Sequence, residues 1–195
     1  MSTLKVDTIL KRTGTGTITV GQSGDTISIP SGATLNSAGT NTLTGINNTP
    51  SFFAFSNADQ AVSDNTTTKV ACNTEIFDSG DYDHSSNYRF TPTVAGKYYV
   101  YGQAFLQGSG FSTLRQATAQ LYKNGASVST SQNNLNNNEA YQLTSTISTV
   151  MDMNGSSDYA ELYAYFNTNN SSAGTIEGHS TLARTCFGAY RLLGA

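Results

Sequence analysis

Apolar and polar residues alternate along much of the chain, most clearly in Lys97–Leu106. A period of two divides this stretch into two sets, Tyr98, Val100, Gly102, Ala104 and Leu106 against Tyr99, Tyr101, Gln103 and Phe105. Aromatic and β-branched residues with this period predict a β-strand. Neither set is polar, whereas a strand of a lone two-layer sandwich usually shows one face to water. We therefore expect one set in a core and the other against a neighbouring subunit. We favour Tyr99, Tyr101 and Phe105 as the subunit contact, although alternation alone also allows the reverse.

Similar short apolar segments follow one another throughout residues 50–195. The predicted strands are Ser51–Ser56, Thr67–Cys72, Glu75–Phe77, Tyr88–Phe90, Lys97–Leu106, Arg115–Tyr122, Ser127–Thr130, Tyr141–Met153, Tyr159–Phe166 and Ser180–Leu193. Asn124-Gly125 is the strongest turn signal between them, because Asn-Gly supplies the positive φ angles of a type I′ hairpin turn. Many short strands, explicit turns and no helical period predict an all-β sandwich or barrel.

Residues 1–49 differ from the rest, because they contain no aromatic residue. Their predicted strands are Leu4–Leu10, Thr15–Val20, Asp25–Pro30, Ala33–Leu35 and Thr42–Ile46. One such chain buries too little apolar surface to offset its ordering entropy. The segment is therefore either a flexible tail or an extended stalk that orders around copies of itself or a docking partner. Its regular Ile, Val and Leu favour the stalk, with Leu4, Val6 and Ile9 as the expected anchor.

Composition excludes several partners. The chain has 195 residues, 12% of them charged, and a net charge of -3, so no basic field would attract nucleic acid or an anionic membrane. No signal-peptide apolar region and no stretch long enough to span a membrane is evident, so we expect no ordinary secretory route. Cys72 and Cys186 both lie in strand-like apolar runs, where buried thiols are the simpler expectation and a disulfide the alternative.

Residues for catalysis or metal binding are not grouped in the sequence. His84 and His179 are the only histidines, and the loop around His84 is better explained as a structural turn than as a metal or sugar site. We therefore predict no enzyme and no cofactor. Two amide-rich loops are either solvated loops or a receptor surface, in which Tyr141 and Tyr165 could stack on sugars. The candidate receptor contacts are Asn133, Asn134, Asn136, Asn169 and Asn170.

The N-terminal sequence STLKVDTILKRTGTGTITV, followed by GDTISIPSGATLN, resembles the N-terminal region of tail-fibre-like structural proteins of marine bacteriophages. The resemblance covers about the first quarter of the chain. It implies a trimeric stalk that attaches to a virion. The boundary with the following domain is predicted at Ile46–Pro50, because its Asn-Asn pair and proline would break any strand ladder and aromatic residues begin directly after it, at Phe52.

The later sequence IFDSGDYDHSSNYRFTPTVAGKYYVY resembles the jelly-roll domain of the complement globular head and the tumour necrosis factor superfamily. The matching positions are Asp78, Tyr82, Asp83, Phe90, Gly96 and Tyr98, then Leu121–Gly125, Gly155, Asp158, Phe187, Gly188, Tyr190 and Leu192. Val100 and Gly102 stand where the family has aromatic residues. The resemblance implies an antiparallel jelly-roll sandwich that assembles as a compact homotrimer.

Together these patterns predict a structural virion protein, assembled in the host cytoplasm. Residues 1–49 would bind another virion protein and form the stalk. Residues 50–195 would form a homotrimeric knob that binds a host surface receptor or glycan. One alternative is a capsid-decorating or head-fibre protein that stabilises the shell without touching a receptor. A second is a secreted lectin-like binding protein, against which the absence of a signal peptide argues.

Overall fold

The computed structural model describes residues 19–34, 48–136 and 138–193. Contacts divide the chain into two compact units, Met1–Thr42 and Leu43–Ala195. The described residues form strands, turns and irregular segments without a helix, which confirms the all-β prediction. Consequently, the described part of the chain offers no helix of the length and apolarity needed to span a bilayer.

Seven strands form the first sheet: β1 (Ser51–Phe55), β2 (Gln60–Val62), β4 (Thr74–Asp78), β7 (Gly96–Gln107), β10 (Gln142–Met153), β12 (Gly174–Ile176) and β13 (Cys186–Arg191). β7 is central: β10 pairs along one side of it, and β13 and β12 pair along the other. The sheet continues from β13 through β1 to β4, and β2 flanks β12. All these pairs are antiparallel.

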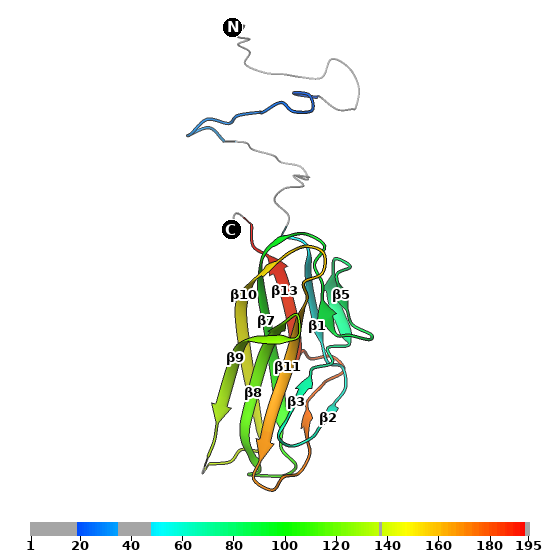
Figure 1. Cartoon of the computed structure of the whole chain (residues 1–195), viewed down its shortest axis with the longest axis vertical. Coiled ribbons are helices and arrows are strands. Elements are labelled where there is room, and N and C mark those ends of the chain that lie inside the picture. The colour runs from blue at the N-terminus through cyan, green and yellow to red at the C-terminus, as the bar shows by residue number, and fades with distance from the viewer. Residues whose placement is uncertain (1–18, 35–47, 137, 194–195) are drawn as a thin grey trace. The chain divides into compact units, whose positions relative to one another are not determined.

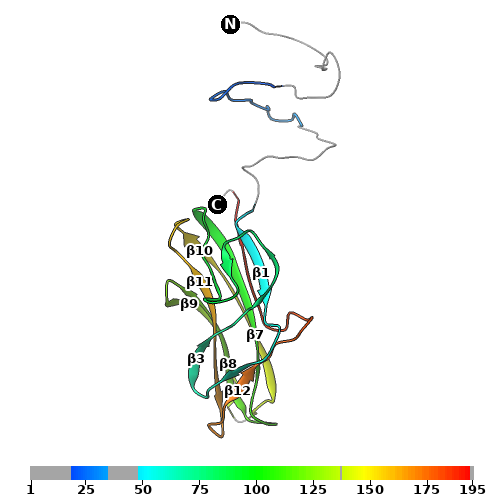
Figure 2. The same ribbon diagram turned by 90° about the vertical axis from the view of Figure 1, so that its right-hand side faces the viewer.

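The second sheet has six strands: β3 (Thr66–Lys69), β5 (Tyr82–Asp83), β6 (Arg89–Phe90), β8 (Leu114–Lys123), β9 (Ala126–Asn134) and β11 (Ala160–Thr168). β11 pairs with β8 over its length, and β9 forms the edge beside β8. Figures 1 and 2 show the two layers of strands from two sides. The predicted β8–β9 hairpin is confirmed, because Asn124 and Gly125 have φ angles of 52° and 79°.

The core lies between the two sheets and is rich in aromatic rings. Phe52 stacks on Tyr82 and Phe90, with ring centroids 4.3 and 4.8 Å apart. Tyr98 and Val100 of β7 are fully buried here, which confirms that this set of the alternation faces the core. Gly102 leaves no room for a side chain, because Leu162 of the opposite sheet fills that space. A Cβ at Gly102 would lie 2.7 Å from Leu162 Cδ1.

The strand directions give the domain two ends. At the basal end, the Arg191 N–H donates to the Asn48 carbonyl (3.0 Å), so the chain enters and leaves the domain there. At the opposite end, which we call the apex, the loops after β7, β9 and β11 meet, at the lower end in Figure 1. The Gly108 N–H donates to the Tyr141 carbonyl, and the Asn169 N–H donates to the Thr113 carbonyl. Each of these hydrogen bonds has a length of 2.9 Å.

Residues 180–185 were wrongly predicted as part of the last strand, which begins only at Cys186. They belong to a loop tied to its neighbours by Thr185, whose Oγ1 accepts from the Phe105 N–H (3.1 Å) and donates to the Glu177 carbonyl (2.7 Å). The short strands β2, β5 and β12 were missed. Three or fewer residues give no readable alternation, so only their partner strands define them.

The described part of the N-terminal unit, residues 19–34, consists of turns and extended chain without a strand. The prediction of a strand at Asp25–Pro30 is therefore wrong for a single chain. A ladder needs a partner strand, and none of the residues described here supplies one. Val20, Ile27 and Ile29 are all exposed. The predicted anchor residues Leu4, Val6 and Ile9 lie outside the described residues.

Candidate functional site

The outer face of the first sheet carries an aromatic patch that no described residue covers. We call it the aromatic face, and its residues are Phe53, Phe77, Tyr99, Tyr101, Val150 and Tyr190. Side chains of a strand alternate between its two faces, and the residues next to these in sequence, such as Phe52 and Tyr98, point into the core. The patch residues therefore share the outer face. Phe77 and Val150 are 51% and 50% exposed, so the face is apolar as well as open.

Three tyrosines and a phenylalanine form the centre of the aromatic face. Ring centroids lie 5.5 Å apart for Tyr99 and Tyr190, 5.9 Å for Tyr99 and Tyr101, and 6.5 Å for Tyr101 and Tyr190. Phe53 stacks on the other side of Tyr101 at 6.2 Å. These distances are those of interacting aromatic pairs. The rings therefore support one another in fixed orientations while their outer surfaces stay free.

An open groove of about 480 Å³ runs beside these rings. It exists because Tyr101 has small neighbours, Ser148 on β10 and Gly188 on β13. A Cβ at Gly188 would lie 2.5 Å from the Tyr101 ring, so only glycine lets the ring cross β13. The lining residues are Tyr99, Tyr101, Gly102, Gln103, Thr146, Ile147, Ser148, Cys186 and Tyr190. None of them is charged, which suits a surface that is to lose its water.

Burial affects the two ionisable groups deepest in this groove. It raises the pKa of Tyr101 above its usual range, and it raises the pKa of the Cys186 thiol to about 11. Both groups are therefore neutral at physiological pH. The ion pair Lys97–Asp152 (2.8 Å) lies at the basal end, and the pair Arg184–Glu177 (3.4 Å) belongs to the segment between β12 and β13. The groove is consequently neutral and its charges are confined to the rim.

Tyr99, Tyr101 and Phe105 were predicted to form one subunit contact, and the structure brings only the first two together. Phe105 points to the same face but lies against its own subunit, with the Arg184 guanidinium 5.9 Å from the ring centroid. Phe53, Phe77, Val150 and Tyr190 were missed. Alternation within each strand shows which of its residues share a face. The register between strands, which places these residues beside Tyr101, cannot be read from one sequence.

The candidate receptor residues are at the apex but differ in how free they are. The Asn133 amide donates to the buried Ser145 Oγ (2.9 Å), so it supports the sandwich itself. Asn134 and Asn136 are exposed. Asn169 donates to the Ser112 carbonyl (3.0 Å) and Asn170 to Ser109 Oγ (3.1 Å), which tie two apical loops together. Receptor contact by these amides remains a prediction.

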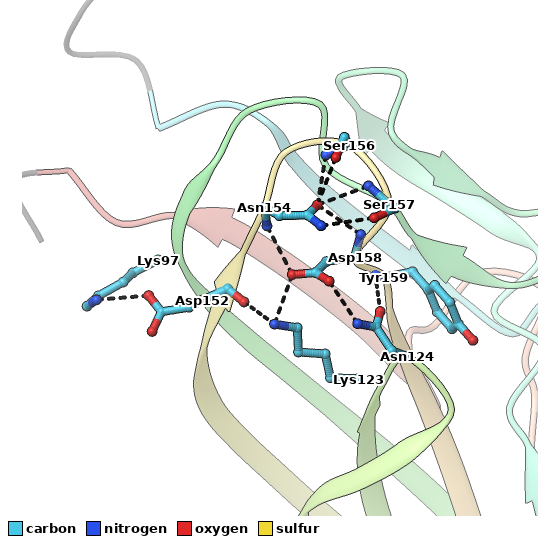
Figure 3. A network of polar contacts seen from close by, with 9 residues as sticks. All are labelled: Lys97, Lys123, Asn124, Asp152, Asn154, Ser156, Ser157, Asp158 and Tyr159. Carbon is cyan, nitrogen blue, oxygen red and sulfur yellow. Dashed lines mark hydrogen bonds and ion pairs between the residues drawn. The ribbon is translucent and has the colours of Figure 1, made fainter.

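A polar network closes the basal end (Figure 3). Asp158 accepts from the Asn124 amide (2.8 Å) and pairs with the Lys123 ammonium (2.9 Å). These contacts hold the pKa of Asp158 below its usual range. The hydrogen bond from Asn124 has the largest effect, and the bond from Lys123 has the next largest. The Asn154 side chain accepts three N–H bonds from residues 156–158. The network fixes two turns and leaves no free acid–base pair.

Other chemistry-bearing residues also have structural partners. His84 Nδ1 lies 2.6 Å from Glu75 Oε1, and His179 Nδ1 accepts from the backbone N–H groups of Thr181 and Leu182. Among the residues described, no three His, Cys, Asp or Glu side chains converge as a metal site would require. Cys72 and Cys186 are both free thiols. The disulfide alternative is therefore wrong, and the expectation of a buried thiol holds for Cys72, whereas Cys186 is partly buried.

Solved structures share this fold. The Eiger TNF structure from S. frugiperda has a TM-score of 0.51 at 9% identity, and the match covers 74% of this chain and 93% of that chain. This likeness supports the jelly-roll fold and concerns the fold alone. The globular domain of zebrafish complement 1qA (TM-score 0.48, 14% identity, 73% and 97% covered) and murine APRIL (0.47, 13%, 73% and 98%) are more distant in shape. No protein-family profile and no curated protein matches the sequence.

Proposed function

We propose that this protein is a non-enzymatic binding knob that works as a homotrimer. The observation that carries the proposal is the aromatic face, with its neutral groove. Soluble monomers seldom leave such a contiguous apolar patch in water. Tyrosine and phenylalanine are enriched, and charged residues depleted, at the centres of protein interfaces. A second and third copy of the chain are the occupants that the face suits best.

We infer three copies from the resemblance of the fold, because closed symmetry alone does not set the number of subunits. Oligomers of one chain are usually closed, so each copy must both offer and cover its share of the interface. The resemblance of Ile76–Tyr101 to the complement-head and tumour necrosis factor jelly rolls implies a three-fold axis. In such a trimer Tyr99, Tyr101 and Val150 would be buried between subunits. Phe105, held by its own Arg184, would lie at the edge of the contact.

The apical loops are the part of each subunit that we propose binds a surface receptor. They lie at the end of the domain opposite to Asn48, where the chain enters. Trimerisation would set three copies of these loops on one rigid body. Binding of the second and third copies then becomes intramolecular, so weak single sites combine into strong attachment.

We also propose that the knob is part of a virion fibre. Residues 1–49 would bind another virion protein through Leu4, Val6 and Ile9. Three things support this role: the resemblance of this segment to phage tail-fibre-like proteins, a neutral composition, and the exposure of Val20, Ile27 and Ile29. Apolar side chains spaced along an unpaired segment would be buried once three chains lie side by side.

A particle-binding experiment tests the virion role. Full-length protein and the fragment 50–195 would each be mixed with virus particles that lack the protein, and the bound fraction would be measured after sedimentation. The full chain should bind, whereas the fragment should stay soluble and trimeric without binding. A full-length variant with Leu4, Val6 and Ile9 changed to Ser should behave like the fragment. Equal binding by the fragment, or no binding by the full chain, would contradict this role.

A further inference from the structure

Phe111 is the most exposed large apolar side chain of the described residues, with 85% of its surface accessible. It lies at the apex in the loop between β7 and β8, and it packs against Tyr141 with the rings tilted by 35° and their centroids 4.7 Å apart. Tyr141 comes from a different loop, the one before β10. The two rings form a small aromatic platform, which we call the Phe111–Tyr141 platform. Tyr141 was predicted as a possible stacking residue from the sequence, whereas Phe111 was missed.

The loop that carries Phe111 is held firmly. Thr113 Oγ1 donates to the Gly110 carbonyl (2.8 Å) and accepts from the Gly110 N–H (3.2 Å), which closes the turn around Phe111. Asn169 binds the Ser112 carbonyl, and Gly108 binds the Tyr141 carbonyl. An exposed ring on a loop with this many bonds is already ordered before a ligand arrives. Binding to it therefore costs little additional entropy.

The surroundings of the platform are polar and uncharged. Ser109 lies two residues before Phe111. Its hydroxyl accepts from the Asn170 side-chain NH₂ group (3.1 Å) and can donate to the Asn170 side-chain oxygen (3.3 Å). These exposed groups can both donate and accept. Arg115 and Glu139, the charged residues closest in sequence, pair with each other (Nε–Oε1 3.3 Å). A ligand for this site therefore needs hydroxyl groups and one apolar surface, but no charge.

We propose that the Phe111–Tyr141 platform binds a sugar ring of a neutral surface glycan. A pyranose has one face of weakly positive C–H groups, which suits the negative face of an aromatic ring. Its hydroxyls lie around the rim, where Ser109 and Asn170 can exchange hydrogen bonds with them. The platform is too small to hold a ligand tightly by itself. This inference rests on the proposed trimer, which would present three platforms together and add avidity.

The experiment compares two substitutions at Phe111 in the full-length protein. The probes are short oligosaccharides of glucose, galactose and mannose, first in solution and then coupled to a surface. Phe111→Leu keeps an apolar side chain but removes the aromatic face, whereas Phe111→Trp keeps that face. Leu182→Ala is the control, because Leu182 is an exposed apolar residue of a different loop. Sedimentation of each variant reports on assembly separately.

We expect wild type, Phe111→Trp and Leu182→Ala to bind at least one of these sugars, and Phe111→Leu to bind it about tenfold more weakly or worse. Equal binding by Phe111→Leu, or no binding of any of the sugars by wild type, would overturn the inference. A trimer that binds no sugar would refute only the glycan site. A monomer that binds sugar through Phe111 would refute the trimer and leave the site.

Discussion

Val150→Asp tests the aromatic face with a control that the chain itself provides. Val150 lies on β10 opposite Tyr99, within the proposed subunit contact, and is 50% exposed in the single chain. Val128 lies on β9 of the other sheet and is 49% exposed. The same substitution at the two sites therefore adds the same charge to equally exposed positions. Only the first should meet another subunit.

The magnitude follows from the exposed half of Val150. Burying a whole valine side chain is worth about 1.5 to 3 kcal/mol, so burying the remaining half contributes about 1 kcal/mol per subunit. Three subunits carry the change, which makes the apolar loss about 3 kcal/mol for each trimer. That corresponds to about a hundredfold decrease in the association constant. Each buried carboxylate also loses its water, at a further cost of several kcal/mol.

Sedimentation velocity over a range of concentrations measures this effect. Val150→Asp should dissociate to monomers at concentrations where wild type and Val128→Asp remain trimeric. Circular dichroism should show the same strand content for all three proteins, since neither valine is in the core. If Val150→Asp stays trimeric at every concentration, or if Val128→Asp dissociates as readily, the aromatic face is not the interface.

Three further predictions concern the fold. Gly102→Ala should lower the free energy of unfolding by about 1 to 3 kcal/mol, because a Cβ there would lie 2.7 Å from Leu162, whereas Gly110→Ala, with its nearest contact at 3.8 Å, should change it little; equal losses in urea titrations would refute this. Because the folded-state pKa of Asp158 is below its unfolded value, its contribution to stability is present at neutral pH and is lost as pH falls through these values. Asp158→Asn should therefore show a smaller loss of thermal stability below about pH 4 than wild type, and an identical acid limb would contradict this. Burial raises the pKa of both thiols, that of Cys186 to about 11, so iodoacetamide should react slowly with native protein and quickly in urea; rapid labelling of the native form would show that the thiols are accessible.

Strand alternation predicted the fold well, because side chains of a strand alternate between its faces whatever the context. It separated Tyr98 and Val100 from Tyr99 and Tyr101, and the assignment that we favoured, with the first pair in the core, is confirmed. The Asn124-Gly125 turn was also predicted correctly, because Asn and Gly are the two residues that most readily adopt the positive φ angles of this turn. Residues 180–185 were misread because they run directly into the apolar strand that begins at Cys186, whereas the Thr185 hydrogen bonds hold them in a loop.

The candidate sites depend on neighbours that the sequence does not show. Phe53, Tyr101 and Tyr190 come from three strands far apart in the chain, and only the register of the sheet brings them together. Phe111 is a single aromatic residue in a Gly- and Ser-rich loop, and nothing in its local sequence distinguishes it. Its exposure depends on the apical loops, whose hydrogen bonds hold the Phe111 loop in place.

The oligomeric state of the full-length protein tests the central claim most directly. Sedimentation equilibrium at micromolar concentration gives the mass without reference to shape. The aromatic face predicts three times the chain mass of 20.7 kDa. A mass of one chain under these conditions would contradict the account, because the face would then remain open to water.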